Sequence, residues 1–170
     1  MDLKDFIRDI PDFPKKGIIY KDITPLLAHA EAMQTAVDLF LKYLPTKNID
    51  KVVGIESRGF FFATLLAQKL NAGFVPVRKK GKLPYKSFSE IYSLEYGEDE
   101  LEIHEDAIAK GEKVLLHDDV LATGGTASAT CRLIEKCGGE IVQCNFLVGL
   151  DFLRGEEKLK SYNVKSLIHY

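Results

Sequence analysis

The sequence predicts an α/β protein in which a parallel β-sheet is flanked by helices. Short apolar runs alternate with segments whose apolar residues recur at helical spacing, as in proteins built from βαβ units. In two of these units a polar turn containing glycine directly follows the strand, at residues 56–59 and 118–126. The length of 170 residues fits a single domain, 1–170, with a sizeable core.

The first ten residues carry apolar side chains at the spacing of one helical face, and Pro11 ends the helix that they predict. A turn-rich connector follows at 12–17. Residues 18–27 begin as a β-edge segment and pass into a loop at Pro25.

The rest of the chain continues the alternation of strands and helices. Pro76 indicates an edge or irregular position in its strand. Residues 85–102 lack a long core pattern, which favours a functional loop or lid, with 100–103 as the returning strand of a β-ribbon. We expect helices at 31–44, 60–70, 127–136 and 156–162, and strands at 52–55, 74–77, 114–116, 140–148 and 164–168.

Composition excludes several classes of protein. Hydrophobic residues make up 46% and charged residues 28%, as in soluble globular proteins, and the net charge of −2 does not favour a nucleic-acid or membrane partner. We find no apolar run that could span a bilayer and no signal-peptide pattern. Cys131, Cys137 and Cys144 form neither a metal spacing nor an even disulfide set, so we interpret them as small buried hydrophobic residues in a reducing, cytoplasmic compartment.

Residues 114–126 combine the features of a phosphate site. An apolar strand is followed by Asp118 and Asp119, and then by a turn of small residues that leads into a helix. Free N–H groups at a helix N-terminus bind phosphate, and carboxylates accept from ribose hydroxyls or contact Mg²⁺. The alternative is an ordinary strand–turn–helix connection with solvated acids, which two adjacent like charges disfavour. The turn consists of Ala122, Thr123, Gly124, Gly125 and Thr126.

Residues 118–126 also resemble the phosphoribosyl-pyrophosphate (PRPP) signature of type I phosphoribosyltransferases, in the variant typical of the adenine phosphoribosyltransferases. His117 departs from the signature, where an apolar residue often precedes the acids. We interpret it as a packed or hydrogen-bonded strand-end histidine and not as a catalytic group.

A second motif, at 17–25, is similar to the adenine-site motif of that family. It implies that Tyr20 is a platform for the purine ring and that Lys21 belongs to the same site, with base stacking worth about 1–3 kcal/mol. From the residue alone, a buried strand aromatic is the favoured interpretation of Tyr20.

Two further motifs resemble the pyrophosphate-binding segments of the family. The first contains Ser57 and Arg58, and the second, at 78–84, contains Arg78, Lys79 and Lys82. Arginine and lysine suit the dense charge of pyrophosphate. Without the resemblance, Arg58 would be interpreted as a solvated turn residue and the charged run at 78–84 as a solvated face.

Residues 93–97 are similar to the mobile-loop motif of the family. The resemblance implies that Glu95 is the acid–base group near N7 of adenine and that Tyr96 packs over the site. A solvated loop acid is the alternative for Glu95.

The resemblance extends from Phe13 to Ile168. It implies the type I phosphoribosyltransferase fold with a small N-terminal hood and base-binding segment (1–30) and a flexible β-ribbon lid (79–103). It also implies conversion of adenine and PRPP into AMP and pyrophosphate in purine salvage, by a homodimer that uses Mg²⁺. The metal is expected to bind mainly through PRPP, without an assigned direct protein ligand, although Asp118 or Asp119 could contact it.

Three other functions fit parts of the sequence. A 6-oxopurine phosphoribosyltransferase would share the sugar-phosphate site, but residues 20–24 argue against it. A non-enzymatic PRPP sensor would need a DNA-binding segment, and too few residues precede the first motif. A generic nucleotide-binding domain would not bind PRPP.

Overall fold

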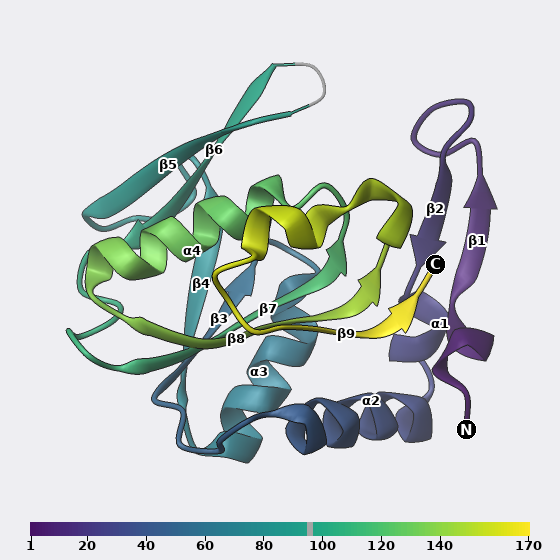
Figure 1. Cartoon of the computed structure of the whole chain (residues 1–170), viewed down its shortest axis with the longest axis horizontal. Coiled ribbons are helices and arrows are strands. Elements are labelled where there is room, and N and C mark those ends of the chain that lie inside the picture. Colours follow the sequence, from purple (N-terminus) through teal and green to yellow (C-terminus); the bar gives the residue numbers. More distant parts are fainter. Residues whose placement is uncertain (95–96) are drawn as a thin grey trace. The chain divides into compact units, whose positions relative to one another are not determined.

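The computed structural model describes residues 1–94 and 97–170, and the chain divides into two compact units, Met1–Lys42 and Tyr43–Tyr170. The first unit contains a two-stranded sheet and the second a seven-stranded sheet (Figure 1). The predicted α/β class is therefore confirmed for the second unit, which contains most of the chain.

The first unit differs from the prediction near Pro11 and near Pro25. Its elements are η1 (Leu3–Phe6), β1 (Arg8–Pro11), β2 (Ile19–Asp22), α1 (Thr24–Leu27) and α2 (Ala30–Tyr43). The last residue of α2 already belongs to the second unit. The helix predicted for residues 1–10 is wrong, because after one 3₁₀ turn the backbone pairs with β2 as an antiparallel strand. The loop predicted at Pro25 is also wrong. Proline is tolerated in the first turn of a helix, and it occupies that place in α1.

The sheet of the second unit has the strand order β5-β6-β4-β3-β7-β8-β9. In the part of the sheet with the order β4-β3-β7-β8-β9, every strand is parallel to its neighbours. The strand β6 pairs antiparallel with β4 and with β5. The strands are β3 (Lys51–Ile55), β4 (Gly73–Lys79), β5 (Ser87–Ser93), β6 (Glu98–His104), β7 (Lys113–Leu121), β8 (Glu140–Gly149) and β9 (Val164–His169).

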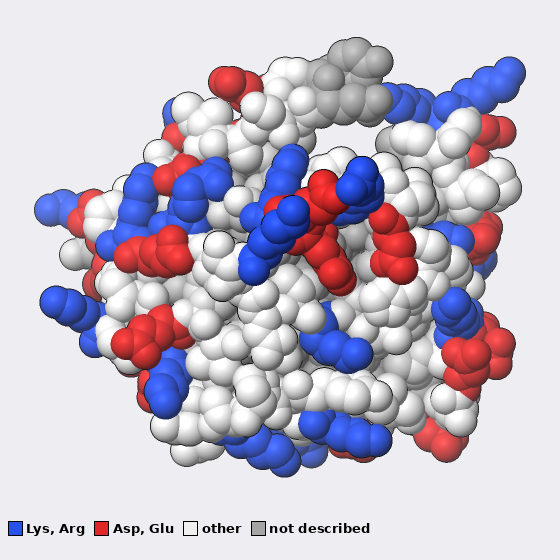
Figure 2. All heavy atoms as spheres, viewed as in Figure 1, with Lys and Arg blue, Asp and Glu red and all other residues white. Residues whose placement is uncertain are grey.

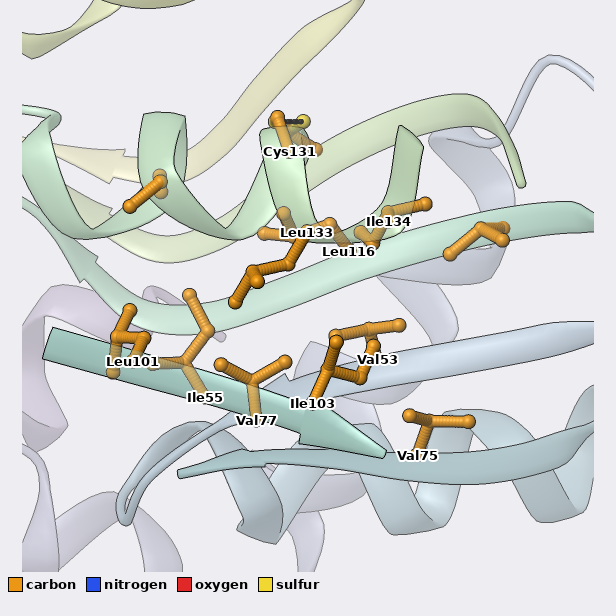
Figure 3. Packing of buried hydrophobic residues seen from close by; sticks show 14 of the residues in the cluster. Val53, Ile55, Val75, Val77, Leu101, Ile103, Leu116, Cys131, Leu133 and Ile134 are labelled. Carbon is orange, nitrogen blue, oxygen red and sulfur yellow. Dashed lines mark hydrogen bonds between the residues drawn. The ribbon is translucent and has the colours of Figure 1, made fainter. Parts of the chain in front are cut away.

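Helices cover both faces of this sheet. The helix α3 (Gly59–Leu70) packs against β3, β4 and β7, and α4 (Gly125–Cys137) lies on the opposite face against β5 to β8 (Figure 1). Side chains from α4 and from the central strands interdigitate in the core, where Val53, Leu116 and Leu133 are fully buried (Figure 3). Burial of strands on both faces explains their continuous apolar runs.

Several boundaries differ from the predictions. The strand β7 continues through Asp118 and Asp119 to Leu121, and α4 begins at Gly125, two residues earlier than expected. The short helix predicted at 156–162 is the 3₁₀ segment η3 (Gly155–Leu159), and η2 (Asp151–Leu153) precedes it. The strand β6 pairs with β4 at Arg78 and Lys79, beyond Pro76. At Pro76 itself β4 is paired on one side, with β3, so the edge position predicted for this proline is confirmed.

The strands β5 and β6 form a hairpin in the region predicted as a lid (Figure 1). The hairpin is attached to α4 through Glu90, whose carboxylate contacts Arg132 Nε at 2.9 Å and Lys136 Nζ at 2.6 Å. Mobility of this lid stays a prediction.

The three cysteines are free thiols, and Cys137 is only half-buried, although all three were predicted to be buried. Cys131 and Cys144 are buried with their Sγ atoms 3.7 Å apart. None of the helices in the described part of the chain is long and apolar enough to cross a bilayer.

Candidate active site

The candidate site lies where the connectivity of the sheet reverses. The strand β3 has β4 on one side and β7 on the other. The chain leaves the adjacent strands β3 and β7 toward opposite faces of the sheet, where α3 and α4 lie. Such a switch point at the carboxyl ends of parallel strands is where α/β proteins bind ligands. A cavity of about 300 Å³ opens here, lined by residues that include Glu56, Arg58, Lys79, Tyr92, Asp118, Asp119, Ala122 and Thr126.

The phosphate-binding turn predicted at 122–126 leads from β7 into α4. It surrounds a hollow of about 70 Å³ that shares Asp118, Ala122 and Thr126 with the larger cavity. Gly124 has a φ of 78°, in the left-handed region that favours glycine, and directly precedes the first helical residue. The N-cap residue Gly124 has no side chain that could cap this helix end, so the N–H groups of the first turn suit an anion.

The two aspartates have different partners. Asp119 is buried, and its Oδ2 lies 2.8 Å from Nε of Arg58, in the turn after β3. Asp118 is half-buried, and its Oδ1 accepts the backbone N–H of Asp119. A side chain on Gly59 would collide with Asp118 Oδ1, so this glycine lets α3 begin beside the acids.

Burial dominates the titration of both acids. It raises the pKa of Asp118 well above its usual range, and the charge of Asp119 adds to this effect. Burial also raises the pKa of Asp119, while the Arg58 guanidinium opposes the rise. The pair is therefore suited to accept a polyhydroxy ligand or a cation that replaces lost hydration.

Glu56 organises the predicted pyrophosphate-binding residues, although we assigned it no role from the sequence. Its carboxylate accepts from Arg78 Nε at 3.3 Å, from the backbone N–H of Lys79 at 2.9 Å, and from Lys82 Nζ. Although burial of the carboxyl group raises its pKa, these donors more than offset that effect and lower it to about 2. Arg78 and Lys82 thus reach the site through Glu56, which directly follows β3.

A second polar chain crosses the cavity from β4 to α4. Lys79 Nζ lies 3.0 Å from Oδ2 of Asp99, and the hydroxyl of Tyr92 donates to the same oxygen at 3.2 Å. Tyr92 and Thr126 both line the cavity, so this chain of contacts ends beside the start of α4. Tyr92 and Asp99 were missed because their alternation along a hairpin is typical of any strand pair.

The other predicted residues are placed as follows. Ser57 is an exposed residue of the turn after β3, next to a cis peptide bond with Glu56. His117 is buried, with Nδ1 2.7 Å from Oδ1 of Asn145, and burial lowers its pKa to about 4. Its predicted role as a packed, hydrogen-bonded residue is confirmed, although it lies within β7 and not at its end.

Tyr20 and Lys21 lie on β2 in the first unit. The ring of Tyr20 packs edge-on against Phe13, with 5.2 Å between ring centroids, and Lys21 Nζ lies 2.7 Å from Oδ1 of Asp9. Glu95 and Tyr96, the predicted catalytic residues, lie outside the described residues.

The side chains available as ligands limit how the site could bind a metal ion. Within residues 1–94 and 97–170, no group of three or more His, Cys, Asp or Glu side chains could hold a metal ion. A divalent cation at Asp118 and Asp119 would therefore need most of its oxygen ligands from a substrate or from water, as Mg²⁺ commonly does.

Comparison with known proteins gives a consistent result. The family model for the phosphoribosyl transferase domain matches residues 22–169. The chain is 74% identical to the adenine phosphoribosyltransferase of Christiangramia forsetii, over all of this chain and 99% of that protein.

Two solved structures extend the similarity to the fold. The adenine phosphoribosyltransferase of Rhodothermus marinus has a TM-score of 0.95 and 53% identity, over 99% of this chain and 96% of that one. The Saccharomyces cerevisiae enzyme, in complex with an imino-altritol bisphosphate and adenine, has a TM-score of 0.93 and 42% identity, over 97% and 96%.

Proposed function

The chain belongs to the adenine phosphoribosyltransferases of the phosphoribosyl transferase family, and from this premise we propose how its residues carry out the reaction. The protein transfers the phosphoribosyl group of PRPP to adenine, which yields AMP and pyrophosphate. The observation that carries the assignment of roles is the cavity at the β3/β7 switch point, where an acidic pair, a helix N-terminus and a set of basic residues meet.

The 5′-phosphate of PRPP binds the turn from Ala122 to Thr126. The backbone N–H groups at the start of α4 donate to the phosphate, and the hydroxyls of Thr123 and Thr126 add neutral donors. This end of the substrate does not react, so its binding energy serves to orient the sugar.

The ribose hydroxyls face Asp118 and Asp119. The ion pair between Asp119 and Arg58 fixes one carboxylate, and the backbone N–H of Asp119 holds the other. Positive charge beside the pair favours the ionised form of both acids and so opposes the effect of burial on their pKa values. In that form the carboxylates accept hydrogen bonds from the ribose hydroxyls and stabilise the positive charge that develops on the sugar as the bond to pyrophosphate breaks.

Pyrophosphate is the leaving group, and basic side chains compensate its charge. Arg58, Arg78, Lys79 and Lys82 are each bound to a carboxylate, namely Asp119, Glu56 or Asp99. Ser57 lies beside Arg58 and offers a hydroxyl. In this proposal the carboxylates hold these cations in position before the substrate enters, and pyrophosphate binds the remaining N–H donors of the same side chains.

Asp118 and Asp119 are the residues that would contact Mg²⁺, with the remaining ligands from PRPP and water. When bound, the metal supplies positive charge that neutralises the leaving group.

Adenine docks on the segment that contains Tyr20 and Lys21. Glu95, from the motif at 93–97, exchanges a proton at N7 of the ring as N9 attacks the sugar, and Tyr96 packs over the site. Closure of the lid over 79–103 excludes water, which would otherwise hydrolyse PRPP. We propose the hood at 1–30, the homodimer and the cytoplasmic location on the same family resemblance.

A base-panel assay tests the function. The purified protein, PRPP and Mg²⁺ are incubated in turn with adenine, hypoxanthine, guanine and xanthine, and product nucleotides are quantified by chromatography. We expect AMP from adenine and at most trace product from the other bases. Efficient IMP or GMP formation would instead assign a 6-oxopurine enzyme.

A further inference from the structure

The short segment η3 packs directly on the phosphate-binding turn. Gly155 is buried, and a Cβ atom on it would overlap the carbonyl oxygen of Ala122. A Cβ atom on Gly124 would in turn overlap the carbonyl oxygen of Gly155. The two backbones are therefore in contact, and Leu159 anchors the far end of η3 in the core.

Lys158 extends from this anchored segment toward the start of α4. Its Nζ lies 3.9 Å from the point that a Cβ atom would occupy on Gly125, the first residue of the helix. Acidic and basic side chains are mixed over the surface of η3 (Figure 2). The adjacent Glu157 pairs with Arg154, and none of the carboxylates in the described ranges forms a salt bridge with Lys158.

We infer that Lys158 binds the 5′-phosphate of PRPP and AMP. The donors of the turn itself are backbone N–H groups and threonine hydroxyls, which are neutral, whereas a phosphate monoester carries up to two negative charges. An ammonium group on a flexible stem can complement that charge without a strict geometry. This inference rests on the proposed function, because it takes the turn at 122–126 as the site of the 5′-phosphate.

The sequence alone assigned no role to Lys158, because it lies about thirty residues beyond the phosphate motif in a segment without a recognised motif. Only the contact between Gly155 and the turn brings the two together. The basic residues assigned to pyrophosphate are bound to Glu56, Asp99 and Asp119, so Lys158 acts on the opposite end of PRPP from that group.

The test compares Lys158→Met with Lys158→Arg and with Lys160→Met, which removes an exposed lysine two residues away. Calorimetry measures the Kd of AMP, of pyrophosphate with Mg²⁺ and of adenine for each variant. We expect Lys158→Met to weaken AMP binding about tenfold, the value of one charge-assisted hydrogen bond at a partly exposed site. Pyrophosphate and adenine binding should change by less than about twofold, and Lys158→Arg should restore most of the AMP affinity.

Three results would overturn the inference. These are an AMP Kd unchanged in Lys158→Met, an equal loss in Lys160→Met, or an equal loss of pyrophosphate binding, since the last two indicate a general charge effect. The wild-type protein must form AMP from adenine and PRPP in parallel. If it does not, the proposed function fails, whereas wild-type activity with an unaffected Lys158→Met variant refutes the role of Lys158 alone.

Discussion

Replacement of Glu56 by glutamine removes the charge around which the basic side chains of the cavity are arranged. The carboxylate accepts from Arg78, Lys82 and the backbone of Lys79. Glutamine preserves the size of the side chain, but its amide has one acceptor oxygen and directs an NH₂ group at cationic donors. We expect Glu56→Gln to destabilise the fold and to raise KM for PRPP, because Arg78 and Lys82 lose the group that orients them.

The lowered pKa of Glu56 sets the size of the effect on stability. The value is about 2, against an ordinary 4.5, and one pKa unit corresponds to ~1.4 kcal/mol, so the ionised side chain contributes ~3 kcal/mol at most. The side chains of Arg78 and Lys82 are 35% and 47% exposed, and solvent screening reduces the contribution to about 1–2 kcal/mol. Because the folded pKa is lowered, this stability is present above pH 4.5 and is lost as the pH falls toward 2.

Urea unfolding at pH 7 and steady-state kinetics measure the two effects. Glu112→Gln is the matched control, since Glu112 also accepts a backbone N–H and pairs with a lysine, Lys51, but does not line the cavity. The control should keep the wild-type KM for PRPP. A Glu56→Gln variant with unchanged KM, and with a free energy of unfolding within about 0.5 kcal/mol of wild type, would refute the reasoning.

Three further predictions concern the lid, the phosphate turn and the core. Glu95→Gln should lower kcat by ~10²-fold or more with little change in PRPP affinity, and an unchanged kcat in steady-state assays contradicts its acid–base role. Gly155→Ala should raise KM for PRPP and cost about 1–3 kcal/mol in urea unfolding, because the methyl group must displace the Ala122 carbonyl. Burial lowers the pKa of His117 from 6.5 to about 4, so in this pH range the unfolded state binds more protons than the folded state. The free energy of unfolding should therefore decrease by up to ~3 kcal/mol as the pH falls from 6.5 to 4.

Controls separate the last two predictions from general effects. Gly73→Ala should be nearly neutral, because its new methyl group meets only the flexible side chain of Lys51. If it costs as much as Gly155→Ala, steric contact with the turn is not the cause. His117→Gln should remove the pH-dependent loss, and equal pH slopes in the variant and the wild type would count against His117 as its source.

The sequence predicted the elements of the second unit well because their signals are local. Apolar runs, helical spacing and glycine turns each reflect burial or backbone geometry within about a dozen residues. The same local reasoning failed at residues 1–10, where the spacing of apolar residues fits a helix but pairing with β2 produces a strand. Long-range hydrogen bonding overrides a short periodic pattern when the pattern is too short to form a stable helix.

The sequence by itself determined the α/β class of the second unit and the position of the turn at 122–126, and it predicted the residue types of the candidate site, because these depend on short-range patterns and charge. The tertiary structure decided which groups interact. It placed Arg58 on Asp119, gathered Arg78 and Lys82 on Glu56, linked Lys79 to Tyr92 through Asp99, and brought Lys158 to the start of α4. These contacts join segments far apart in the chain, so they depend on the order of strands in the sheet and on close backbone packing, which no local pattern encodes.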